Sequence, residues 1–154
     1  MNLYLKQHVF TWGDRFSIYD IDGNSVFSVE SEVFTFGKKL HVFDFNGNEV
    51  AFIRQRLFNF MPNYSVSING KELFEVQKCF AFFSRKYYAE NLGIMVNGDF
   101  TAHEYTAEKE GRAIFSVSKR WFTFGDAYEI NIRDIDPLVA LCIVLIVDAC
   151  DSDE

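Results

Sequence analysis

The sequence predicts a mainly β protein, with a twelve-stranded antiparallel closed barrel around a central hydrophobic C-terminal helix. Aromatic residues make up 18% of the chain and there are only 2 prolines, a composition that favours pleated, half-buried strands. Apolar and polar residues alternate in short runs separated by turn signals, which is the period of β-strands. One long apolar run near the C-terminus breaks that pattern and predicts a single helix.

A repeated segment organises the chain. Residues 10–24 recur as residues 34–48, both opening on Phe-Thr-aromatic-Gly, and the opening returns at residues 122–126. Repetition at a fixed period indicates one supersecondary unit that cannot bury its apolar face alone. We interpret the aromatic residues of this motif as core anchors beside a turn glycine, in preference to a set that stacks on a ligand.

Asp-Gly and Asn-Gly pairs between the alternating runs predict β-hairpins, because type I′ turns need a positive φ at both central residues. These pairs are Asp22-Gly23, Asn46-Gly47, Asn69-Gly70 and Asn97-Gly98. The predicted strands are centred on Leu5, Ile18, Phe27, Val42, Phe52, Val66, Phe74, Tyr87, Met95, Ala102, Phe115 and Ile130. Since one face of each strand is polar, the pattern favours an antiparallel sheet.

The apolar run at residues 138–147 predicts the helix. Asp136 and Pro137 form a start signal before it, because Asp caps unpaired N–H groups and Pro is tolerated at the first helical position. A helix that is apolar on every face must be buried in a core or in lipid. At about 1.5 Å per residue this helix is about 20 Å long, short of the roughly 30 Å needed to span a bilayer. We therefore place it inside the barrel and expect no membrane span.

The chain is expected to form a single domain over residues 1–154, since this length is sufficient for one core. The strands should occupy about residues 3–133, the central helix about 137–150, and an acidic tail 151–154. Closing the sheet into a barrel also removes the exposed strand edges that would be hazardous in so aromatic a sheet.

Charge and cysteine usage exclude some function classes. The 22 acidic and 15 basic residues give a net charge of -7, which argues against nucleic-acid binding. Three widely spaced cysteines suggest neither a disulfide framework nor a metal knuckle. The first residues lack a charged segment followed by an apolar one, so we expect no signal peptide and a location in the cytoplasm, including its membrane surface.

Four segments of the chain occur in an order that resembles the LURP-one-related family. They are the turn at residues 20–23, the segment 34–56 with its Asp-Phe-Asn-Gly-Asn-Glu-Val-Ala core, residues 64–66 and the terminal apolar helix. The fold of that family is shared with the Tubby C-terminal domain and the phospholipid scramblases. The resemblance implies a twelve-stranded barrel around a central helix, and no enzyme activity. Tubby-like domains are associated with phosphoinositide headgroups, and scramblases with calcium-dependent lipid movement.

No motif predicts catalysis, a cofactor or a metal. Residues 20–24 place oxygens at alternate positions like the start of a calcium loop, but a full EF-hand loop needs Gly and Glu where this chain has Ser25 and Ser31. We interpret the segment as a hairpin turn. A nucleophile elbow, a phosphate-binding loop, a dinucleotide fingerprint and a zinc-protease motif are all missing from the sequence. The histidines are expected on the surface: His8, His41 and His103.

Basic pairs are the candidate binding site, because they can hold an anionic lipid headgroup through charge-assisted hydrogen bonds. Arg54 and Arg56 share one strand face, and Lys38-Lys39 follow the second glycine of the repeated motif. The candidate headgroup-binding residues are Lys38, Lys39, Arg54, Arg56, Arg85 and Lys86. The alternative interpretation is solvated charge on the outer face of the barrel.

These observations favour a non-enzymatic binding module for a membrane-surface lipid headgroup or a protein partner. One alternative is a scramblase-like lipid transporter, or an enzyme with a pocket at the barrel mouth. That alternative needs the helix to leave the barrel or a cavity that the helix leaves unfilled. Another is a structural or stress-associated scaffold.

Overall fold

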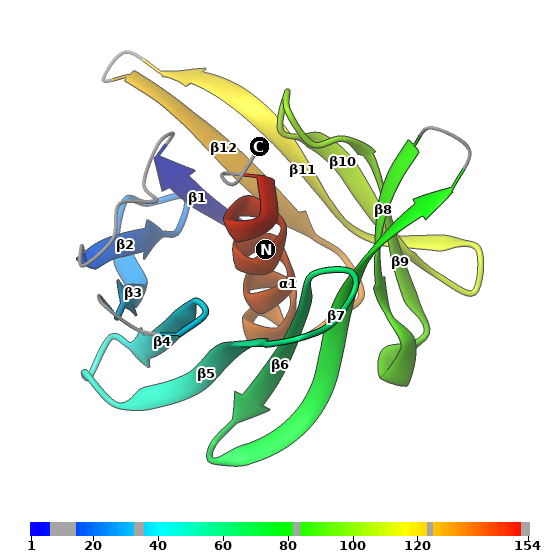
Figure 1. Cartoon of the computed structure of the whole chain (residues 1–154). Helices are drawn as coiled ribbons and strands as arrows, with labels where there is room; N and C mark the ends of the chain where they lie inside the picture. The colour runs from blue at the N-terminus through cyan, green and yellow to red at the C-terminus, as the bar shows by residue number, and fades with distance from the viewer. Residues whose placement is uncertain (7–14, 33–35, 82–83, 123–124, 152–154) are drawn as a thin grey trace.

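The computed structural model describes residues 1–6, 15–32, 36–81, 84–122 and 125–151. Within them, twelve antiparallel strands close into a barrel, and one α-helix runs through its interior (Figure 1). The predicted fold class is therefore confirmed.

The strands follow one another along the chain with short connections. They are β1 (Asn2–Lys6), β2 (Arg15–Tyr19), β3 (Ser25–Ser31), β4 (Lys39–Asp44), β5 (Glu49–Arg56), β6 (Asn63–Ile68), β7 (Lys71–Ala81), β8 (Ser84–Ala89), β9 (Ile94–Asp99), β10 (Glu104–Lys109), β11 (Arg112–Phe122) and β12 (Gly125–Ile132). A 3-10 helix, η1 (Glu90–Leu92), lies between β8 and β9, and the helix α1 (Pro137–Asp151) ends the described chain.

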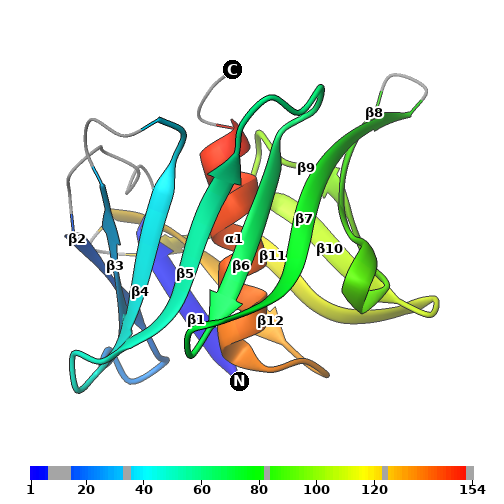
Figure 2. The ribbon, with the colours of Figure 1, turned by 60° about the horizontal axis from the view of Figure 1, so that its bottom comes forward.

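Each strand pairs with its neighbours in the chain, and β1 closes the barrel by pairing with β12. The connections therefore alternate between the two ends of the barrel (Figure 2). We call the end at which α1 finishes the C-end; it carries the β3–β4 and β5–β6 connections. The opposite end, the N-end, carries the β2–β3 and β4–β5 connections.

The core lies between the inner face of the barrel and α1. Alternate strand residues point inward, as in β5, where Ala51 and Ile53 are buried while Arg54 and Arg56 are exposed. The helix is buried on all sides, from Ala140 to Val147, with exposed fractions of 0–2%. A helix that is apolar all round needs such an environment.

The start of α1 follows the predicted signal. The Asp136 carboxylate accepts hydrogen bonds from the backbone N–H groups of Leu138 (2.8 Å) and Val139 (3.3 Å). Pro137 occupies the first helical position, where the lack of an N–H costs nothing. This cap satisfies two of the donors that a helix N-terminus leaves unpaired.

The Asp-Gly and Asn-Gly pairs take three different conformations. Asn69 and Gly70 have φ of 52° and 82°, as the hairpin prediction requires. In the two preceding hairpins only the glycine has a positive φ, and a carboxylate organises the turn instead. The Asp20 carboxylate accepts the backbone N–H groups of Asp22 and Asn24, both at 2.9 Å. The segment that resembles a calcium loop is thus a hairpin turn, as predicted.

The hairpin predicted at Asn97-Gly98 is wrong, because both residues lie within β9. Position 98 requires a glycine because the backbone of Tyr105 on β10 passes close to it. A Cβ at this position would lie 2.5 Å from the Tyr105 Cα. The predicted strand centre at Ala102 is also wrong, because β9 continues through Asn97-Gly98 to Asp99 and Ala102 lies in the β9–β10 connection. The following hairpin instead has Glu110 and Gly111 at φ of 52° and 75°.

The prediction that the motif aromatics are core anchors is wrong at Phe36, whose side chain is 91% exposed. Phe36 lies in the β3–β4 connection beside Gly37, beyond the inward-facing positions of the strands. Several of the predicted features lie outside the described residues. They are the first copy of the motif at residues 10–13, residues 34–35 of the second copy, residues 123–124 of the third, His8, and the acidic tail beyond residue 151.

Candidate functional site

Three of the predicted basic residues lie together on the outer face of the barrel at the C-end. Lys39 begins β4, and Arg54 and Arg56 lie at the end of β5. They line a groove of about 510 Å³, and the remaining lining residues are Phe36, Gln55, Leu57 and Asn59. This groove is the candidate site.

The pairing of β4 with β5 places Lys39 directly opposite Arg54. Both side chains point outward, because the neighbouring positions Leu40 and Ile53 are buried. Like charges directly opposite each other on adjacent strands destabilise a sheet. Among the described residues, neither Lys39 nor Arg54 forms an ion pair with a carboxylate. An anion in the groove would relieve their repulsion.

Arg56 differs from these two cations because acidic side chains already surround it. Its guanidinium lies 2.6 Å from a carboxylate oxygen of Glu72 and 2.6 Å from one of Glu75, both on β7. The hydrogen bond to Glu72 and the charge of Glu75 raise the pKa of Arg56. Arg56 therefore lines the groove, but Glu72 and Glu75 neutralise its charge.

Backbone contacts hold the β3–β4 connection against β5 and so shape the groove. The Lys38 N–H donates to the Gln55 side-chain oxygen at 3.0 Å, and the Gln55 N–H donates to the Lys38 carbonyl at 2.8 Å. Gly37 has φ of 77°, and a Cβ there would lie 3.0 Å from the Leu57 Cδ2. The two connections are thus packed against each other.

The structure separates Lys38 and Arg85 from this groove. Lys38 is 6% exposed, and its ammonium donates to the backbone carbonyl of Ala149 in the last turn of α1. Arg85 forms an ion pair with Asp151 at 3.1 Å and donates to the Thr101 hydroxyl at 3.2 Å. Both cations stabilise the negative end of the helix dipole.

Lys86, the sixth candidate, lies on β8 opposite Cys79 and does not line the groove. Adjacent strand residues point to opposite faces, so Lys86 and its neighbour Arg85 cannot act on one ligand from the same side of the sheet. The six candidates therefore do not form one patch.

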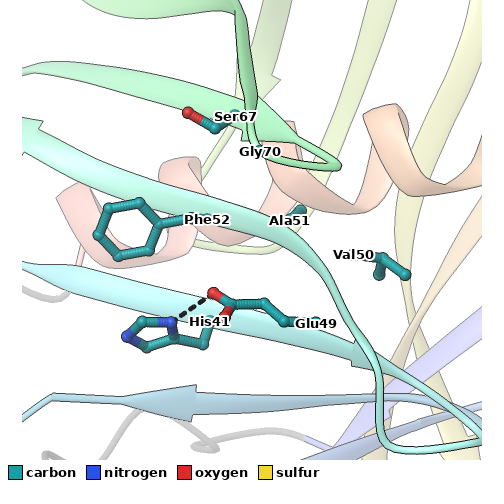
Figure 3. Close-up of a pocket in the computed structure, with 7 residues that line it drawn as sticks. All are labelled: His41, Glu49, Val50, Ala51, Phe52, Ser67 and Gly70. Carbon is teal, nitrogen blue, oxygen red and sulfur yellow. Dashed lines mark hydrogen bonds and ion pairs between the residues drawn. The ribbon is translucent and has the colours of Figure 1, made fainter.

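A second hollow, of about 470 Å³, lies on the outer face of β4, β5 and β6 (Figure 3). Its polar feature is His41, whose Nδ1 lies 2.6 Å from Glu49 and whose Nε2 lies 2.8 Å from Glu32. Partial burial lowers the pKa of His41, but the two carboxylates outweigh that effect and raise it overall. Since both ring nitrogens are engaged, this histidine offers neither a base nor a metal ligand.

His103, next to the wrongly predicted strand centre at Ala102, lies in the β9–β10 connection, where its φ is 55°. Its ring stacks on the buried ring of Tyr128, with centroids 4.7 Å apart and planes 1° from parallel. In the described part of the chain, no cluster of three or more His, Cys, Asp or Glu side chains has the geometry to hold a metal ion.

Sequence reasoning missed the apolar walls of the groove and the Glu32–His41–Glu49 arrangement. Leu57 follows the Arg54–Arg56 pair directly, so its place beside the cations could be inferred from the end of the strand. Glu49 pairs with Phe43, two residues after His41 on the neighbouring strand, so counting outward from the turn at residues 44–48 places Glu49 diagonally opposite His41. Glu32 needed the β3–β4 pairing, which sequence alone did not supply.

Comparisons with known proteins agree with this architecture. The chain is 33% identical over 158 residues to the uncharacterised protein YxjI of Bacillus subtilis (strain 168), covering 100% of this chain and 98% of that protein. An X-ray structure of a protein from Arabidopsis thaliana has the same fold, with a TM-score of 0.70 and 16% identity, over 97% of this chain and 90% of the other. The sequence model described as LURP-one-related matches residues 1–148. The chain therefore belongs to the LURP-one-related family.

Proposed function

We propose that this protein is a non-enzymatic binding module that works peripherally at a membrane surface, where Lys39 and Arg54 hold the phosphate of an anionic lipid headgroup. The observation that carries this proposal is the pairing of these two cations across β4 and β5 without a carboxylate partner among the described residues. Charge-assisted hydrogen bonds to a phosphate would satisfy both side chains at once.

The chemistry of the groove favours binding over catalysis. Its lining residues are aromatic, aliphatic, amide and cationic, and none is a carboxylate, a histidine or a cysteine. Histidines and carboxylates are the commonest general acids and bases, and cysteine is a strong nucleophile near neutral pH. A guanidinium and an ammonium at the base of an open groove are suited to holding an anion in place.

The scramblase-like alternative requires α1 to leave the barrel or a cavity that α1 leaves unfilled, and the contacts of the helix bear on the first of these. Asp136 caps the first turn of the helix, and Lys38 and Arg85 contact its last turn, so both ends are held. None of the helices in the described ranges has the length and apolar character needed to cross a membrane. These contacts favour a helix that stays in place over a transporter.

Vesicle co-sedimentation at low ionic strength tests the proposal, because screening is weakest there. We expect binding to vesicles that contain phosphatidylglycerol and little binding to vesicles of phosphatidylcholine alone. The double variant Lys39→Ala, Arg54→Ala should bind about 30-fold more weakly, since each Lys or Arg near an anionic surface contributes about 1 kcal/mol.

Lys71→Ala, Lys109→Ala is the matched control, since it removes two exposed cations from the N-end and changes the net charge equally. The control should bind like the wild type. Equal losses in both double variants would mean that only net charge matters and would refute a site at Lys39 and Arg54. Failure of the wild type to bind any anionic vesicle would reject the lipid proposal and favour a protein partner.

A further inference from the structure

Large apolar side chains stand out from the protein beside the candidate groove. Phe36 in the β3–β4 connection is 91% exposed, and Phe58 and Phe60 in the β5–β6 connection are 102% and 100% exposed. Leu57, which lines the groove together with Phe36, is 43% exposed. Isolated exposed apolar residues are common, but four around one charged groove indicate an interaction surface.

These side chains project from one end of the molecule. Figure 2 shows the β5–β6 connection at the same end as the last turn of α1, beyond the tips of the strands. Gly37 packs on Leu57, which keeps Phe36 near the β5–β6 connection. The exposed apolar side chains therefore lie at the same end of the barrel as Lys39 and Arg54. We call Phe36, Leu57, Phe58 and Phe60 the apolar tip.

Phe58 has an unfavourable backbone conformation, with φ of 66°. A bulky residue rarely adopts the left-handed region, where Gly and Asn are the usual residues. Its ring makes no compensating contact, because the residue is fully exposed. Backbone strain at a position without stabilising contacts indicates that Phe58 serves binding and not the stability of the fold.

The N-end provides a contrast within the same molecule. Ile21 is 73% exposed and Phe45 is 78% exposed, both in hairpin turns. Each of these turns is organised by a carboxylate, that of Asp20 or that of Asp44. The backbone N–H of Asn24 lowers the pKa of Asp20, so this carboxylate is charged at neutral pH. The exposed apolar side chains of these two N-end turns thus lie beside carboxylates, whereas those at the C-end lie beside Lys39 and Arg54.

We propose that the apolar tip inserts into the interfacial region of a lipid bilayer, while Lys39 and Arg54 lie at the level of the lipid phosphates. This inference rests on the proposed function and specifies a bilayer surface, in place of a free phosphorylated solute, as the ligand. Phe and Leu are among the side chains that peripheral segments bury at the membrane–water interface, and cations next to them match the negative surface of anionic lipids. The barrel then docks with its C-end toward the membrane.

The protruding geometry favours a bilayer over a folded protein partner. Rings that are almost fully exposed on two adjacent connections match a soft medium into which they can sink. A protein partner of standard size needs a broad, complementary patch. Insertion of apolar groups with an attraction between charges is how peripheral proteins lie at an interface.

The test compares two double variants of the whole chain in vesicle binding and in lipid monolayers. Phe58→Asn, Phe60→Asn removes two rings, and Asn tolerates the left-handed conformation of position 58, so folding is preserved. Ile21→Asn, Phe45→Asn removes two exposed apolar side chains from the N-end as a matched control. We expect the first variant to bind phosphatidylglycerol vesicles on the order of 100-fold more weakly, and the control to bind normally.

In monolayers that contain phosphatidylglycerol, the wild type and the control should raise the surface pressure, and the Phe58, Phe60 variant should not. Unchanged vesicle binding by that variant, together with a loss in the Lys39, Arg54 variant, would overturn the insertion and leave the proposed function intact. Unchanged binding by the Lys39, Arg54 variant would overturn the proposed function itself. A wild type that binds no anionic vesicles would overturn both.

Discussion

The ammonium of Lys38 donates a hydrogen bond to the backbone carbonyl of Ala149, which lies 111 residues further along the chain. Lys38 comes from the β3–β4 connection at the C-end, and Ala149 from the last turn of α1. The carbonyls of a last helical turn have no partners within the helix and carry the negative end of the dipole. A lysine predicted to bind a ligand thus caps the central helix.

Replacing this lysine should destabilise the fold. We expect Lys38→Met to lower the free energy of unfolding by about 1.5–3 kcal/mol, the range for a lost hydrogen bond to a charged group. Methionine keeps an apolar stem but leaves the Ala149 carbonyl without this donor. Urea unfolding measures the difference, and Lys39→Met, next in the chain but directed outward, should change stability by less than about 0.5 kcal/mol. Equal effects of the two changes would contradict the capping role.

Gly98 should tolerate no side chain. A Cβ there would lie 2.5 Å from the Glu104 carbonyl oxygen and 2.5 Å from the Tyr105 Cα, so β9 and β10 would have to separate. We expect Gly98→Ala to cost about 3 kcal/mol or more, beyond the usual range for overpacking, because backbone atoms cannot rotate away. Thermal unfolding followed by circular dichroism measures the loss.

Gly111→Ala is the control for this steric effect. Gly111 also has a positive φ, of 75°, but a Cβ there would meet no atom within 4 Å. Its cost should be limited to backbone strain, about 1–2 kcal/mol. If the two substitutions cost the same, close strand approach is not the reason for glycine at position 98.

His41 should make stability depend on pH. Its carboxylate partners raise its pKa above the ordinary value of 6.5, even though burial opposes the shift, so the native state binds this proton more tightly than the unfolded chain. The resulting stabilisation is complete below about pH 6.5 and is lost as the pH rises through the folded-state pKa. Urea unfolding of the wild type and of His41→Gln should therefore differ most at about pH 6 and least at about pH 9.

Glu49→Gln tests the origin of this pH dependence, because it keeps the size of the side chain and removes one of the two charges next to His41. The pH dependence should become weaker in this variant while the histidine remains. A pH profile of stability that is identical in the wild type, His41→Gln and Glu49→Gln would exclude the ion pairs as its source.

Local patterns were sufficient for most of the fold. Alternation located eleven of the twelve predicted strand centres within strands, and Asp136-Pro137 marked the start of α1. The failure at Asn97-Gly98 has a physical reason. The same dipeptide serves a tight turn or a close approach of two backbones, and only the position of Tyr105 distinguishes these uses.

The candidate site was less accessible to local reasoning. Alternation correctly placed Arg54 and Arg56 on one outer face. It could not show that Lys39 faces Arg54, because that depends on the β4–β5 register. Nor could it show that Glu72 and Glu75, two strands away on β7, neutralise Arg56. Phe36 was assigned to the core because an aromatic residue in a repeat is commonly buried.

Sequence alone determined the number and order of the strands, the turn residues of three hairpins and the fully apolar helix that the barrel must enclose. Each of these features depends on residues close together in the chain. The tertiary structure decided which cations are used internally and which remain available. Lys38 and Arg85 reach the end of α1, and Lys39 and Arg54 face outward beside the apolar tip. Those roles depend on contacts between distant segments, which only barrel closure around the helix brings together.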